Sequence, residues 1–165
     1  MNATVEMPAP ALKSNSVRPD KQKILLVDDD PAIRQILLRL LAEEGYLVLT
    51  AANGVEALEL VKVTEPDLVL LDLNMPVKDG WETFMELSIV HRHLPVILIT
   101  ARPNQFFSAL ASGAGALLEK PLDFVKLFST IQSLLEEPTE DRLARLSGRP
   151  SAFAYRPPIP DFGKK

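Results

Sequence analysis

The chain has 165 residues, of which 47% are hydrophobic and 24% are charged, a length and balance typical of one globular domain with its own core. The net charge of -4 argues against direct nucleic-acid binding, which calls for clustered Lys and Arg. Without cysteine, the chain has no disulfides, no thiolate catalysis and no cysteine-based zinc site.

The first 22 residues predict a flexible leader, because they are polar and carry Pro8, Pro10 and Pro19. They lack the basic start and apolar run of a secretory signal. No apolar stretch reaches the ~18 residues that a membrane span requires. We therefore expect a cytoplasmic protein that does not insert into a membrane.

Five short apolar runs begin after Lys23 and show no polar alternation, which is typical of strands buried on both faces of a parallel sheet. The runs are 24–27, 47–49, 68–71, 96–99 and 116–118.

Segments with helical periodicity separate these runs. In the first of them Pro31 suits the first helical position and Asp30 suits the cap before it. The segments are 31–41, 55–63, 81–90, 105–110 and 124–135. Alternation of five strands with five helices predicts an α/β domain over residues 23–137, built as an open doubly wound parallel sheet.

Residues 138–165 form a third region. Thr139 is placed to cap a short helix ending at Leu146. The remainder is rich in proline, and we expect it to be extended or disordered. Phe153, Tyr155 and Phe162, among prolines and basic residues, also give it the composition of a docking segment.

Polar residues interrupt the apolar runs at the carboxyl ends of the predicted strands. Asp28 and Asp29 follow the first run, and Asp72, Thr100 and Lys120 stand at the ends of the third, fourth and fifth. In doubly wound sheets the ligand crevice lies outside those carboxyl ends. We therefore expect these side chains to converge on one site.

The expected site carries an excess of negative charge. Two carboxylates about 4 Å apart repel each other by roughly 4 kcal/mol at an effective dielectric constant of about 20. Lys120 supplies one counter-charge, and a Mg²⁺ ion held by Asp28 and Asp29 would supply two more. Asp72, alone at the end of its strand, is then the candidate nucleophile for a phosphoryl group, while Lys120 and the Thr100 hydroxyl would bind phosphoryl oxygens.

Five segments, in this order and spacing, resemble the response-regulator receiver (CheY-like) family. They are KILLVDDDP, AANGVEAL, LVLLDLNMPVKDGWE, PVILITA and LEKP. The resemblance covers residues 23–137. It implies a flavodoxin-like (βα)5 fold with strand order 2-1-3-4-5.

The same resemblance implies the roles of the acidic residues. Asp72 corresponds to the phosphorylated aspartate, and Asp28 and Asp29 to the acidic pair, with Asp29 the more direct magnesium ligand. The metal ligands would be Asp28, Asp29, Asp72 and the backbone carbonyl of Asn74. The phosphoryl donor would be a histidine kinase or a histidine phosphotransfer protein.

Thr100 and Lys120 correspond to the switch hydroxyl and the essential lysine of the family, which also implies a cis peptide bond before Pro121. One position departs from the family pattern. Leu117 stands three residues before Lys120, where receivers usually carry Phe or Tyr. We therefore expect readout of phosphorylation to be weaker or differently routed than through a rotating aromatic ring.

The leading interpretation is a stand-alone receiver in a two-component phosphorelay. We expect it not to be an enzyme. Its output would run through contacts with a protein target that the sequence does not identify. Homodimer formation is left open. A magnesium-dependent phosphohydrolase is the alternative, but Asn74 stands where such enzymes usually place a second Asp as general acid. A degenerate receiver acting as a constitutive binding module is disfavoured by the intact set of site residues.

Overall fold

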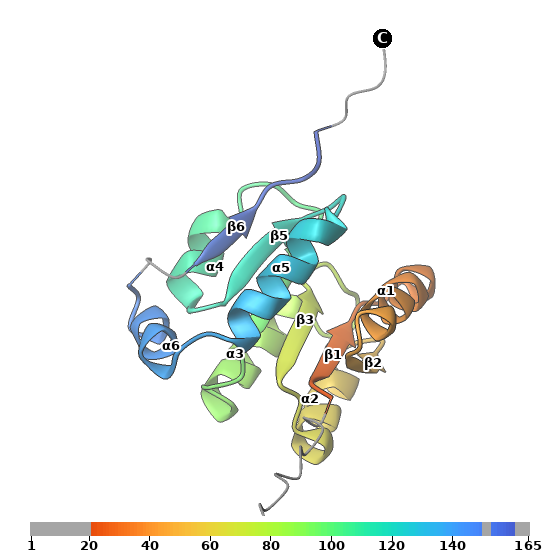
Figure 1. Cartoon of the computed structure of the whole chain (residues 1–165), viewed down its shortest axis with the longest axis horizontal. Helices are drawn as coiled ribbons and strands as arrows, with labels where there is room; N and C mark the ends of the chain where they lie inside the picture. The colour runs from red at the N-terminus through yellow and green to blue at the C-terminus, as the bar shows by residue number, and fades with distance from the viewer. Residues whose placement is uncertain (1–20, 150–152, 161–165) are drawn as a thin grey trace, which may run out of the picture.

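The computed structural model describes residues 21–149 and 153–160, so the predicted leader lies outside the described residues except for Lys21 and Gln22. All strands belong to one parallel sheet with the order β2-β1-β3-β4-β5-β6 (Figure 1). The strands are β1 (Lys23–Val27), β2 (Leu47–Ala51), β3 (Leu68–Asp72), β4 (Val96–Thr100), β5 (Ala116–Glu119) and β6 (Ala154–Arg156).

The helices begin where the sequence offers caps. The carboxylate of Asp30 accepts hydrogen bonds from the amides of Ala32 and Ile33, and Asp79 and Asp123 cap later helices in the same way. The helices are α1 (Pro31–Glu43), α2 (Gly54–Thr64), α3 (Gly80–Val90), α4 (Phe106–Ser112), α5 (Phe124–Leu135) and α6 (Thr139–Leu146). None of those in the described ranges is long and apolar enough to cross a membrane.

The sheet is covered on both faces, which explains the uninterrupted apolar runs. Helices α1 and α5 pack on one face, where Leu37, Leu41 and Ile131 are buried. Helices α2, α3 and α4 pack on the other, with Phe84 and Leu87 in the core (Figure 1). The α/β doubly wound fold and the order of the first five strands are as predicted.

The predicted number of strands was wrong, because the sheet has six strands rather than five. The sixth comes from the Pro-rich tail, where Ala154 pairs with Ala116 and Tyr155 with Leu117. Figure 1 shows β6 alongside β5 at the edge of the sheet. A strand of three residues has no detectable period of its own, so its presence depends on pairing with a partner distant in sequence.

The register of the strands aligns their carboxyl ends. Asp72 pairs with Ile99, and Thr100 pairs with Glu119, the residue before Lys120. Asp28 directly follows β1, and its amide donates to the carbonyl of Ala51 at the end of β2. The predicted site residues therefore share one edge of the sheet.

Candidate functional site

Three carboxylates meet at the carboxyl edge of the sheet. One oxygen from each of Asp28, Asp29 and Asp72 lies within 4.8 Å of the others. Asp28 and Asp72 are 2% and 3% exposed, whereas Asp29 is open to solvent. Backbone amides hold the two buried carboxylates: Asp30 N donates to Asp28 Oδ1 (2.9 Å) and Asn74 N to Asp72 Oδ1 (2.8 Å). The site thus combines two fixed carboxylates with one accessible carboxylate.

Lys120 bridges the two buried carboxylates. Its Nζ lies 2.8 Å from Asp72 Oδ2 and 3.1 Å from Asp28 Oδ2. The peptide bond between Lys120 and Pro121 is cis, as the family resemblance implied. The sequence prediction that these distant segments converge is therefore confirmed in geometry.

The pKa values of Asp28 and Lys120 reflect this crowding. Burial raises the pKa of Asp28, and the charge of Asp72 adds to this effect, although the Asp30 amide and Lys120 act in the opposite direction. Burial alone would lower the pKa of Lys120. The hydrogen bond and charge of Asp72, together with Asp28, outweigh burial and raise it. The lysine is therefore held in its charged form between its two partners.

The chemistry of this cluster fits a hard divalent cation. Three carboxylates face the single charge of Lys120, which leaves an excess of two negative charges when all are ionised. Carboxylate oxygens are the ligands that Mg²⁺ prefers, and Mg²⁺ takes few of them from the protein. The exposed Asp29 gives an approach from solvent. In the described part of the chain this is the one grouping of three or more such side chains.

Thr100 lies at the same edge, but its hydroxyl does not bond to the carboxylates. It donates to the side-chain oxygen of Asn74 (3.1 Å), which also accepts the amide of Ala101 (3.0 Å). Sequence reasoning assigned Asn74 only through its backbone carbonyl and missed this side-chain contact. An amide side chain two residues beyond a strand end was the available signal. Asn74 therefore links the loop after β3 to the loop after β4.

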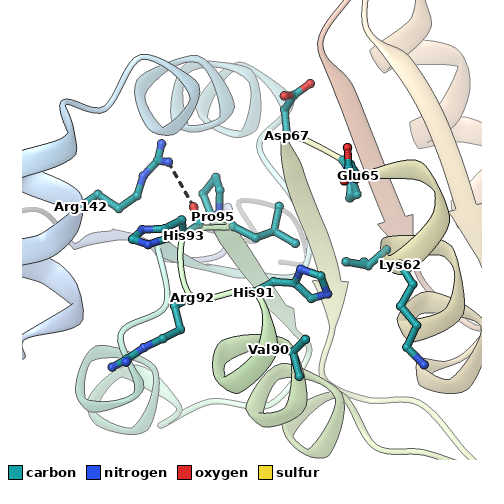
Figure 2. A pocket seen from close by; sticks show the side chains of 12 residues that line it. Lys62, Glu65, Asp67, Val90, His91, Arg92, His93, Pro95 and Arg142 are labelled. Atoms are coloured by element: carbon teal, nitrogen blue, oxygen red, sulfur yellow. Dashed lines mark hydrogen bonds between the residues drawn. The ribbon is translucent and has the colours of Figure 1, made fainter.

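A separate hollow of about 460 Å³ lies at the amino ends of β3 and β4, away from the carboxylates. Figure 2 shows His91, His93 and Asp67 around it, with Arg142 of α6 donating to the His93 carbonyl (3.1 Å). None of the predicted site residues lines this hollow. It is distinct from the carboxylate site.

Relatives among characterised proteins share this region. The sequence is 40% identical over 124 residues to the response regulator MprA of Mycobacterium leprae and 39% identical over 121 residues to MprA of Mycobacterium sp. (strain KMS). These matches cover 74% and 72% of this chain but only 54% and 53% of the relatives. The chain thus spans about half the length of these curated relatives.

Solved structures agree. A CheY-like receiver domain protein from Methanospirillum hungatei JF-1 superimposes with a TM-score of 0.68 at 29% identity, over 73% of this chain and 98% of its own. The response regulator TrrA of Thermotoga maritima, in complex with Mg²⁺ and BeF, gives 0.65 at 35% identity, over 68% and 98%. The family model of the response regulator receiver domain matches residues 24–132. The chain therefore belongs to the response regulator receiver domain family.

Proposed function

We propose that this protein accepts a phosphoryl group on Asp72 from the phosphohistidine of a histidine kinase or histidine phosphotransfer protein, and that it passes the signal on through protein contacts. The observation that carries the proposal is Lys120, whose ammonium bridges Asp28 and Asp72. Aspartate phosphorylation and magnesium binding are general in the family. Because the phosphoryl group stays on the protein, the domain serves as a switch rather than as a turnover enzyme.

The proposed step is an exchange of bonds at phosphorus. A carboxylate oxygen of Asp72 forms a bond to phosphorus while the bond from phosphorus to the donor's imidazole nitrogen breaks, and that nitrogen keeps the electron pair. The ammonium of Lys120 then leaves the carboxylates and binds one phosphoryl oxygen. The hydroxyl of Thr100 leaves Asn74 and donates a hydrogen bond to a second phosphoryl oxygen. Charge neutralisation and positioning by these groups are what phosphoryl transfer requires.

A Mg²⁺ ion would be held by Asp28, Asp29, Asp72 and the backbone carbonyl of Asn74. It would supply positive charge next to the oxygens of the transferred group. Asp28 and Asp72 are already oriented by backbone amides, so little reorganisation of those carboxylates is required.

An apolar hollow beside Lys120 supports a protein donor. It has a volume of about 360 Å³ and lies between α1 and the start of α5. Ile36 and Phe124, which line it, are 51% and 41% exposed. An apolar surface next to the reacting atoms suits the face of an amphipathic helix that presents a phosphohistidine.

The proposal is tested by incubation with acetyl phosphate and magnesium followed by intact mass. We expect one phosphate per chain, and removal of magnesium with EDTA should reduce the rate of incorporation about a hundredfold, because carboxylate repulsion then opposes the incoming phosphate. NaCl at the same ionic strength, in place of the magnesium salt, is the control for ionic strength. Steady release of phosphate from general monoesters, without a stable adduct, would favour the phosphohydrolase instead.

Trp81 offers an optical reading of the same event. It is the sole tryptophan, and its Nε1 donates to Oε1 of Gln105 (3.2 Å), the last residue of the loop 101–105 that follows Thr100. When the Thr100 hydroxyl and the Ala101 amide give up their hydrogen bonds to Asn74 and donate to a phosphoryl oxygen instead, this loop moves. We therefore expect tryptophan fluorescence to change on addition of beryllofluoride and magnesium. Gln105→Ala should blunt the change. A response of wild-type size in that variant would show that the loop is not its source.

A further inference from the structure

Strand β6 covers the edge of β5 with few contacts. Its three residues pair with Ala116–Leu118, and the flanking backbone hydrogen bonds, from Ala154 N to Gly115 O and from Ile159 N to Pro121 O, are both 3.4 Å long. On the side of α5 and α6 a hollow of about 830 Å³ lies next to β6. The contacts on that side are the packing of Ala154 against the core and a hydrogen bond from Arg156 Nε to Thr130 Oγ1 (3.4 Å). With three residues β6 is the shortest strand of the sheet, and its aromatic side chains pack on the side of α4.

Aromatic rings provide that packing. Phe153 and Tyr155 both lie edge-on to the ring of Phe106, with centroids 5.7 and 5.2 Å away. Phe106 is the first residue of α4, a helix of seven residues whose N-cap, Gln105, makes no side-chain capping bond. The position of α4 and the docking of β6 therefore depend on the same three rings.

Two short routes join these rings to the carboxylate site. The loop 101–105 runs from Thr100 directly to Phe106. The hydroxyl of Tyr155 also donates to Glu119 Oε1 (3.0 Å). Glu119 directly precedes Lys120 and stands two residues after Leu117, which pairs with Tyr155 in the sheet.

The position of Tyr155 also bears on the missing aromatic residue of β5. Leu117 is fully buried and faces the α4 side of the sheet, and Tyr155 lies beside it in register on that same side. The tail thus places an aromatic ring next to the strand position where the family resemblance led us to expect one.

We propose that Phe153–Arg156 is a releasable ligand of the β5 edge and that phosphorylation of Asp72 undocks it. The inference rests on the proposed function, since it needs Thr100 to leave Asn74 for the phosphoryl group. That movement pulls the loop 101–105, displaces Phe106 and breaks its contacts with Phe153 and Tyr155. The freed edge then suits an extended segment with aromatic side chains at alternate positions, which is the pattern of the tail itself.

Hydrogen exchange read by mass spectrometry on the full chain tests this proposal. After treatment with acetyl phosphate and magnesium, amides of residues 153–160 should exchange about tenfold faster, as expected for a local opening, while those of Lys23–Val27 stay unchanged. The same sample is weighed intact. An incorporated phosphate with unchanged exchange in the tail would overturn the undocking and leave the proposed function standing. Absence of incorporation would overturn both.

Tyr155→Phe tests the hydrogen bond to Glu119 separately from the aromatic packing, because it removes the hydroxyl and keeps the ring. Without phosphorylation we expect exchange in residues 153–160 to rise about fivefold, the effect of one hydrogen bond. Tyr46→Phe, at the opposite edge of the sheet, is the matched control and should leave the tail unchanged. Equal protection of the tail in Tyr155→Phe and wild type would contradict the role of Tyr155.

A synthetic peptide of residues 151–158 probes the freed edge. Labelled with a fluorophore, it should bind the beryllofluoride-loaded full chain at least about tenfold more tightly than the unloaded chain, because its own tail no longer competes. Equal binding to both forms would contradict a phosphorylation-controlled edge.

Discussion

Asp72→Asn is expected to abolish phosphoryl acceptance while leaving the fold intact. The amide has the shape of the carboxylate but is a far poorer nucleophile, so incorporation from acetyl phosphate should fall by about a thousandfold or more. The side-chain oxygen can still accept the amide of Asn74, and Lys120 keeps Asp28 as a partner. Loss of one charge from a crowded carboxylate cluster should leave thermal stability equal or higher.

The measurement is intact mass over time, with far-UV circular dichroism to verify the fold. Asp67→Asn is the matched control, because Asp67 precedes the same strand at its amino end and accepts a bond from Lys23 N (2.7 Å). It should incorporate phosphate at the wild-type rate. Undiminished incorporation in Asp72→Asn would place the acceptor elsewhere in the chain.

Gly80→Ala is expected to cause the largest loss of stability among conservative substitutions near the site. A Cβ at this position would lie well under 3.0 Å from the Asp72 carbonyl oxygen and from Leu73 Cα, and both are backbone atoms that cannot rotate away. The cost should be about 3 kcal/mol in the free energy of unfolding, the upper end of ordinary overpacking. The forced shift also moves Asp72, so phosphate incorporation should slow.

Urea unfolding of Gly80→Ala and of Gly45→Ala measures this loss in the free energy of unfolding. Gly45→Ala is the control, because Gly45 has a φ of +96° but open space around it. It should cost only about 1 kcal/mol, from backbone strain alone. Similar losses in the two variants would mean that close approach to the β3 backbone is not what requires glycine at position 80.

Most of the fold could be predicted because local signals and tertiary structure agree. Asp30 and Pro31 mark the start of α1, and the helical period over 124–135 coincides with α5. The interpretation of 47–49 as a strand buried on both faces was too strong, because β2 is an edge strand and Leu47 is 45% exposed. Apolar runs alone do not distinguish a central strand from an edge strand.

The carboxylate cluster was predictable for a topological reason. Parallel strands place their carboxyl ends together, so Asp28, Asp72 and Lys120 had to meet once the sheet was assigned. The bond from Thr100 to Asn74 was not predictable, because the orientation of a side-chain amide depends on its neighbours in space. The contact between Tyr155 and Phe106 was hidden for a similar reason, since it joins a three-residue strand to a helix far away in the chain.

The central claim is that the convergence of Asp28, Asp29, Asp72 and Lys120 makes Asp72 the phosphoryl acceptor. Reduction of the phosphorylated protein with borohydride converts an acyl phosphate into a stable alcohol, and peptide mapping then locates it. We predict homoserine at position 72, in amounts that match the incorporated phosphate. Homoserine at another aspartate, or phosphate incorporation without any reducible acyl group, would contradict the account.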